Sequence, residues 1–138
     1  MNEYTFEQLQ IGKTEQFTVA ITEDKMKSFC ELSGDTNLLH TDENFARNYG
    51  FGGKVVYGML TASLISQLGG VYLPGKYCII QQVETKFVSP VYVGDCLTVV
   101  GTVKELHESV KQMVVKVEIY NQLGKKVLRG LLTTGFLE

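Results

Sequence analysis

The most constraining feature of this 138-residue sequence is one segment that is apolar or small on nearly every face of the helix it predicts. Residues 58–68 read Gly-Met-Leu-Thr-Ala-Ser-Leu-Ile-Ser-Gln-Leu, and the pair Gly69-Gly70 then ends the helix. Such a helix must be enclosed by other elements, because none of its faces prefers water. The rest of the chain therefore has to wrap around it.

The segments after this helix are suited to the wrapping. They are rich in β-branched residues, partly alternate in polarity, and lie at residues 77–88, 96–106, 111–120 and 126–136. A turn at residues 121–124 predicts an antiparallel hairpin between the last two. Residues 14–21 predict one earlier strand. The expected fold class is α+β, with a curved antiparallel sheet around a central buried helix.

Two further helices are predicted between the first strand and the buried helix. Thr22 is a suitable N-cap for the first one, and Gly34 ends it. The second spans about residues 42–48 and is capped by Thr41 or Asp42. The segment between these helices is expected to be a loop.

Composition and charge fit one globular domain, residues 1–138, with 44% hydrophobic and 20% charged residues. The formal net charge is −2 and the longest basic run is Lys125-Lys126, so no nucleic-acid partner is expected. The N-terminus is too polar for a signal peptide, and no membrane-spanning segment is expected. Three cysteines without a C-x-x-C pair argue against a disulfide framework or a cysteine-based zinc site, which favours a reduced, cytoplasmic protein.

The strongest candidates for chemistry are Asp35 and His40, five positions apart after the end of the first helix. A carboxylate and an imidazole on one loop can share a water molecule and move its protons. The spacing alone has little specificity, however. Asp35 as the cap of a turn and His40 as a half-buried structural residue explain it as well.

Gly58 is a second candidate, because the free backbone N–H groups of a helix start can bind a developing oxyanion. The alternative is a glycine needed only for close packing. Ser66 lies two turns further along the same helix and could form a hydrogen bond within a pocket. Its alternative partner is the carbonyl of Ala62, four positions earlier.

Four motifs occur together in a recognisable order. They are residues 33–42, residues 51–53, residues 57–60, and residues 87–91 with 93–95. The set resembles the MaoC-like hydratases and, more narrowly, the single-domain (R)-specific enoyl-CoA hydratases. The match covers nearly the whole chain from about Phe6. The resemblance implies a hot-dog fold with an overhanging segment of helices and loops.

The resemblance also implies roles for individual residues. Asp35 and His40 would form the catalytic dyad, and Asn37 would support the geometry of their loop. The N–H of Gly58 would hold the thioester oxygen, and Ser66 corresponds to a serine of the substrate pocket.

Two residues depart from the family pattern. Leu38 replaces a proline and frees φ at that point of the loop. Tyr57 replaces a histidine and changes the size and polarity of the substrate site near the thioester.

The implied reaction is syn addition of water to a trans-2-enoyl thioester, giving an (R)-3-hydroxyacyl product, or the reverse dehydration. No metal or cofactor is expected, since the substrate itself carries coenzyme A or the phosphopantetheine of an acyl carrier. A homodimer or higher oligomer is also implied. Two alternatives stay open: a hot-dog acyl-CoA thioesterase, and a non-catalytic module that binds acyl thioesters.

Overall fold

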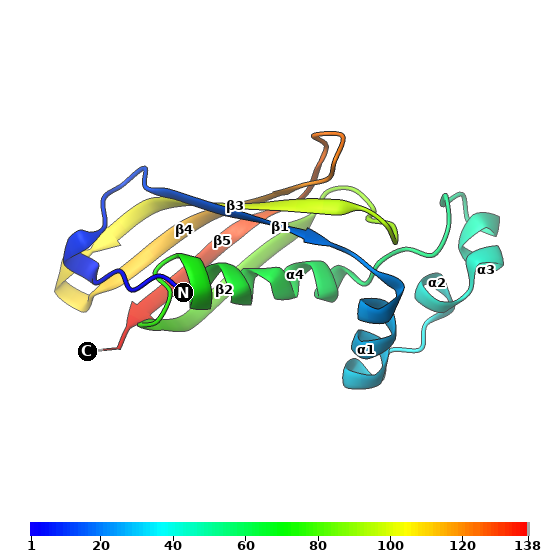
Figure 1. The fold of residues 1–138 in the computed structure, drawn as a ribbon, viewed down its shortest axis with the longest axis horizontal. Helices are drawn as coiled ribbons and strands as arrows, with labels where there is room; N and C mark the ends of the chain where they lie inside the picture. Colours follow the sequence, from blue (N-terminus) through cyan, green and yellow to red (C-terminus); the bar gives the residue numbers. More distant parts are fainter. Residues whose placement is uncertain (138) are drawn as a thin grey trace.

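A computed structural model describes residues 1–137 as one antiparallel sheet with a helix along one face (Figure 1). The elements in chain order are η1 Phe6–Gln8, β1 Thr14–Ala20, α1 Glu23–Ser33, α2 Leu38–Thr41, α3 Glu43–Asn48, α4 Gly58–Gln67, η2 Leu68–Tyr72, β2 Cys78–Phe87, β3 Cys96–His107, η3 Glu108–Val110, β4 Gln112–Tyr120 and β5 Lys126–Phe136. The α+β class and the strand positions predicted from the sequence are confirmed.

The five strands are ordered β1-β3-β4-β5-β2, and every neighbouring pair is antiparallel. The predicted hairpin between β4 and β5 is present, with Ile119 opposite Leu128. β2 pairs only with β5 among the described strands, so its other edge is unpaired within this chain.

The core lies between α4 and the sheet. Leu64, Ile65 and Leu68 pack there against strand residues such as Val99 and Val117, all of them nearly inaccessible to solvent. The approach is close enough that a Cβ at Gly101 on β3 would lie 2.9 Å from the methyl groups of Leu68. Burying each large aliphatic side chain contributes about 1.5–3 kcal/mol, so this layer holds the helix to the sheet.

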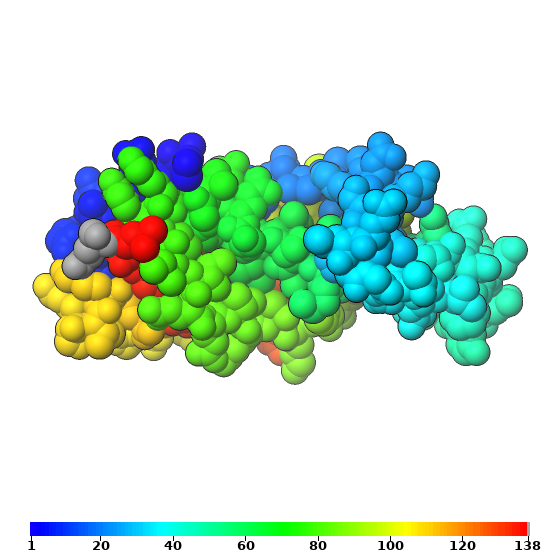
Figure 2. All heavy atoms as spheres, turned by 90° about the horizontal axis from the view of Figure 1, so that it is seen from below, coloured from blue at the N-terminus to red at the C-terminus, as the bar shows by residue number. Residues whose placement is uncertain are grey.

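The predicted enclosure of α4 on all sides is wrong for the single chain. Met59 is 65% exposed, and Ser63 and Ser66 are exposed on the same side of the helix. Five strands from one chain cover one side of a helix and leave the other uncovered. From the side opposite the sheet, atoms of α4 and β2 form much of the molecular surface (Figure 2).

α1, α2 and α3 form a segment that projects beyond the sheet at the end where α4 begins (Figure 1). The Thr22 side chain caps α1, and Gly34 ends it with φ of 72°. Of the two caps considered for α3, Asp42 is the one used, and its side chain accepts the N–H of Phe45. The expected loop between α1 and α3 is partly wrong, because Asn37 caps the short helix α2 and so places His40 on a helix.

Candidate active site

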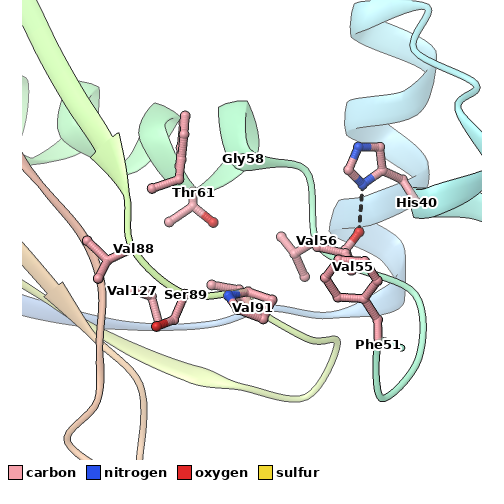
Figure 3. A pocket seen from close by; sticks show the side chains of 12 residues that line it. His40, Phe51, Val55, Val56, Gly58, Thr61, Val88, Ser89, Val91 and Val127 are labelled. Atoms are coloured by element: carbon pink, nitrogen blue, oxygen red, sulfur yellow. Dashed lines mark hydrogen bonds between the residues drawn. The ribbon is translucent and has the colours of Figure 1, made fainter. Parts of the chain in front are cut away.

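A pocket of about 300 Å³ lies where the projecting segment meets the start of α4. Its lining includes His40, Val56, Gly58, Thr61, Phe87 and Val91. The lining is mostly apolar, with a few polar groups that converge from different elements (Figure 3). Apolar walls with few polar groups are typical of a small-molecule site.

His40 is fixed by a hydrogen bond to the backbone. Its Nδ1 lies 2.7 Å from the carbonyl oxygen of Val55 (Figure 3). A carbonyl oxygen only accepts hydrogen bonds, so Nδ1 carries the hydrogen. The neutral imidazole therefore has its lone pair on Nε2, which is the nitrogen able to take a proton from water.

Asp35 lies on the exposed turn between α1 and α2. Its Oδ1 accepts the N–H of Asn37 at 3.0 Å, and its own N–H donates to the hydroxyl of Ser33 at 3.1 Å. The turn-capping role considered for Asp35 is thus present. The carboxylate is solvent-exposed and is not part of the pocket lining, whereas His40 is half-buried and lines it.

Tyr57 contacts both Asp35 and His40. Its hydroxyl donates to the backbone carbonyl of Asp35 at 2.7 Å, and its ring stacks on the ring of His40 with centroids 4.2 Å apart. Burial raises the pKa of the Tyr57 phenol well above its usual range, so the hydroxyl stays protonated and continues to donate. The ring is 2% exposed and lies behind His40, so its polar group faces the Asp35 turn instead of the pocket.

Gly58 is the first residue of α4 and lines the pocket. The N–H groups of Leu60 and Thr61 both bond to the carbonyl of Tyr57, while the N–H of Gly58 comes too early in the helix for an intrahelical partner. A Cβ on Gly58 would lie 3.1 Å from the ring of Phe87. The packing role considered for this glycine is therefore real, and it leaves the helix N-terminus beside the pocket.

Two further predicted site residues, Asn37 and Ser66, also lie outside the pocket lining. The side chain of Asn37 accepts the N–H of Leu39 at 2.9 Å, which supports the turn as expected. Ser66 is exposed on the uncovered side of α4 and does not line the pocket of the same chain. Neighbouring Ser63 bonds back to the carbonyl of Leu60.

Thr61 lines the pocket although sequence reasoning gave it no role. It is 2% exposed, and its hydroxyl is buried without a hydrogen-bond partner. The available signal was its position, three residues after Gly58 on the same helix face.

Residues 1–137 contain no group of three or more His, Cys, Asp or Glu side chains arranged to hold a metal ion. None of the helices described there is long and apolar enough to cross a membrane. Cys30, Cys78 and Cys96 are free thiols. Burial raises the pKa of the Cys78 thiol to about 11, so this sulfur is a neutral thiol at neutral pH.

Known proteins resemble this chain in sequence and in fold. The chain is 34% identical to the (R)-specific enoyl-CoA hydratase of Rhodospirillum rubrum over 93% of this chain and 88% of that protein. It is 37% identical to a 3-hydroxybutyryl-CoA dehydratase of Methylorubrum extorquens, over 73% of this chain but only 64% of that protein's length. The solved structure of an (R)-hydratase from A. caviae superposes with a TM-score of 0.90 at 32% identity, covering 95% of this chain and 99% of that one.

The sheet, the helix along it and the pocket at the helix start define a hot-dog-fold protein. Residues 7–127 match the family model of the MaoC like domain. The chain therefore belongs to the MaoC-like family. The predicted family membership is thus confirmed.

Proposed function

We propose that this protein is an (R)-specific enoyl-CoA hydratase or 3-hydroxyacyl-thioester dehydratase, a hydro-lyase that adds water to trans-2-enoyl thioesters or removes it in the reverse direction. The observation that carries the proposal is the meeting of His40 and the N-terminus of α4 at Gly58 in one apolar pocket. Relatives that share about a third of the sequence are named as hydratases and dehydratases of this kind.

The proposed dyad handles the water. His40 offers Nε2 as a hydrogen-bond acceptor, since Nδ1 donates to Val55. Asp35 and His40 are held near each other by Tyr57, whose hydroxyl bonds to the Asp35 carbonyl and whose ring stacks on His40. The carboxylate and the imidazole hold one water molecule between them and take a proton from it as its oxygen attacks C3.

The proposed electron flow balances without a cofactor. The C3–O bond forms, the C2=C3 π electrons move toward the thioester carbonyl, and the resulting enolate oxygen accepts a hydrogen bond from the N–H of Gly58. The dyad then returns a proton to C2, which restores the carbonyl. The net change is the addition of one water molecule, and nothing is oxidised or reduced.

We also propose that two copies of the chain assemble into a homodimer. Apolar side chains are exposed on edge strand β2, where Ile80 is 40%, Val83 45% and Phe87 51% exposed. Met59 is exposed on neighbouring α4, whose sequence predicts burial on every side. A partner that pairs with the free edge of β2 covers both surfaces.

The test uses purified protein and crotonyl-CoA, with chiral analysis of the products. Wild type is expected to form (R)-3-hydroxybutyryl-CoA, and Asp35→Asn and His40→Ala are each expected to lower kcat by about a hundredfold or more, as for loss of a general acid–base group. His107→Ala and Asp42→Asn serve as matched controls, since His107 is exposed and asparagine caps a helix as well as aspartate does. Full activity in both dyad variants would eliminate the dyad.

The same assay separates the alternatives. Release of free CoA without a hydroxyacyl product would identify a thioesterase. Binding of acyl-CoA without any turnover over a panel of chain lengths would identify a binding module.

A further inference from the structure

Two buried hydroxyls among the described residues have no hydrogen-bond partner, those of Thr61 and Thr134. A buried polar group without a partner lowers stability, so native proteins rarely keep one without a reason. Thr134 is enclosed in the sheet on β5. Thr61 differs because its side chain lines the pocket that also contains His40 and Gly58.

The usual partner of a helical threonine is already occupied. A threonine on a helix commonly bonds to the carbonyl four residues earlier, which here belongs to Tyr57. That carbonyl accepts the N–H groups of Leu60 and Thr61, at 3.0 and 3.2 Å. In Figure 3 the hydroxyl of Thr61 points away from the helix, into the space bordered by Val56 and Val91.

The position of Thr61 brings its side chain toward Gly58. Residues three apart share a helix face, and side chains lean toward the helix N-terminus. A ligand oxygen bound at the start of α4 therefore lies within reach of both the Gly58 N–H and the Thr61 side chain.

We propose that the hydroxyl of Thr61 is a second hydrogen-bond donor to the thioester oxygen of the substrate, beside the N–H of Gly58. This inference rests on the proposed hydratase function and extends its oxyanion site by a catalytic residue. An enolate oxygen carries more negative charge than the ground-state carbonyl, so a donor fixed here stabilises the transition state more than the substrate.

The ring of Phe87 lies against this site. Its ring atoms lie 3.1–3.4 Å from where a Cβ on Gly58 would be, so the ring covers the first turn of α4. The side chain is 51% exposed in the single chain and is not part of the buried core. A thioester that displaces the ring reaches the Gly58 N–H and the Thr61 hydroxyl together.

The main experiment compares Thr61→Val, which replaces the hydroxyl by a methyl group, with Thr61→Ser, which keeps it. Thr61→Val is expected to lower kcat for crotonyl-CoA about tenfold to a hundredfold while KM changes little, as for removal of one oxyanion donor. Thr61→Ser is expected to stay within about threefold of wild type on the same scale. Thr134→Val is the matched control, because it removes the other unpartnered hydroxyl far from the pocket lining and leaves kcat unchanged.

A stability measurement identifies the role of the hydroxyl. Both valine variants are expected to unfold at a higher temperature than wild type, since each removes an unpartnered buried hydroxyl. Only Thr61→Val is expected to combine higher stability with lower activity, the combination expected where a binding group is kept at a cost in stability.

A binding measurement keeps this proposal separate from the hydratase proposal. Acetoacetyl-CoA ionises to an enolate that presents the same charged oxygen, and its absorbance reports the ionised fraction. Wild type and Thr61→Ser are expected to bind this enolate about tenfold more tightly than Thr61→Val. If wild type lacks hydratase activity but shows this difference, the hydrogen-bonding site stands and the proposed reaction fails.

Three results would overturn the inference while leaving the hydratase proposal intact. Thr61→Val could keep the wild-type kcat and enolate affinity. Thr61→Ser could lose as much activity as Thr61→Val, which would make side-chain shape the cause. Thr134→Val could match the activity loss of Thr61→Val, which would remove the link to the pocket. Absence of both turnover and enolate binding in wild type would overturn both proposals.

Discussion

At the scale of single residues, the backbone around the pocket determines what each side chain can do. The carbonyl of Val55 fixes the tautomer of His40, and the carbonyl of Asp35 receives the hydroxyl of Tyr57. Tyr57 and Leu38 are the two departures from the family pattern. The two residues lie near each other in the structure. Leu38 is the first residue of α2, directly after the turn whose Asp35 carbonyl accepts the hydrogen bond from Tyr57.

Tyr57→Phe tests the positioning role of the hydroxyl. The variant keeps the ring stacked on His40 but loses the 2.7 Å hydrogen bond to the backbone carbonyl of Asp35, so the turn carrying Asp35 becomes more mobile. We expect kcat for crotonyl-CoA to fall about tenfold with KM within about twofold of wild type, measured by steady-state kinetics. Tyr49→Phe is the control, since Tyr49 is 69% exposed and lies outside the pocket lining. An unchanged kcat in Tyr57→Phe would remove the positioning role.

Leu38→Pro is expected to restore part of the activity of Tyr57→Phe. Leu38 is the first residue of α2, where proline is favoured, and the preceding Asn37 has φ −55° and ψ 132°, which a following proline accepts. Proline stiffens the turn that the tyrosine hydroxyl otherwise holds. In a double-mutant cycle on kcat, we expect the loss from Tyr57→Phe to be smaller in the Leu38→Pro background. Additive effects would show that the two residues act independently.

At the scale of elements, the neighbouring inner strands β4 and β5 are joined by an ion-pair cluster on the face of the sheet opposite α4. Glu118 on β4 accepts from Lys126 at 2.7 Å and from the hydroxyl of Tyr120 at 2.7 Å, and Lys116 lies 3.5 Å away. The hydrogen bond from Lys126 is the main cause that lowers the pKa of Glu118 from 4.5 to about 2. The cluster joins the two strands of the β4–β5 hairpin, and β5 contacts α4 on the other face of the sheet.

The lowered pKa predicts the pH dependence of stability. The folded state holds Glu118 ionised to lower pH than the unfolded chain does, so its contribution is complete above the unfolded pKa and is lost as the pH falls from about 5 to 2. We expect this contribution to be about 1–3 kcal/mol, reduced by the solvent exposure of both lysines.

The measurement is urea unfolding of wild type and Glu118→Gln across this pH range. The free energy of unfolding of the variant is expected to be lower than that of wild type at neutral pH, with the difference shrinking toward pH 2. Glu31→Gln, on the exposed side of α1, is the control and is expected to follow wild type. A constant difference at every pH would show that the ion pairs are not the cause.

At the scale of the whole molecule, one chain leaves its central helix half covered. Val83 and Phe87 stand opposite Leu132 and Leu128 in the β2–β5 ladder, and both of those leucines are buried in the core. Since paired residues share a sheet face, Val83 and Phe87 lie on the helix side of β2. An exposed apolar area that combines a free strand edge with an uncovered helix is typical of an interface.

Val83→Lys tests this surface. Sedimentation at micromolar concentration is expected to give a dimeric mass for wild type and a monomeric mass for the variant, because the substitution buries an unpaired charge at the interface. Leu123→Lys, at an 83% exposed leucine in the β4–β5 turn, is the control and is expected to remain dimeric. A monomeric wild type would remove the dimer proposal and leave the exposed side of α4 unexplained.

Much of the architecture was determined by the sequence itself. The uninterrupted apolar character of residues 58–68 and the alternation in the later strands required a helix packed on a sheet, because burial follows directly from side-chain periodicity. The ordered motifs identified the family, and with it His40 and Gly58 as pocket residues.

Tertiary structure decided everything that depends on residues distant in the sequence. Only the folded chain places the Val55 carbonyl against His40, the Tyr57 hydroxyl against Asp35 and an unpartnered Thr61 hydroxyl in the pocket. It also showed that a helix with no polar face is covered on one side alone. The hydrophobic pattern of a sequence predicts that a surface is buried. Which residues bury it, in the same chain or in a second copy, depends on packing in three dimensions.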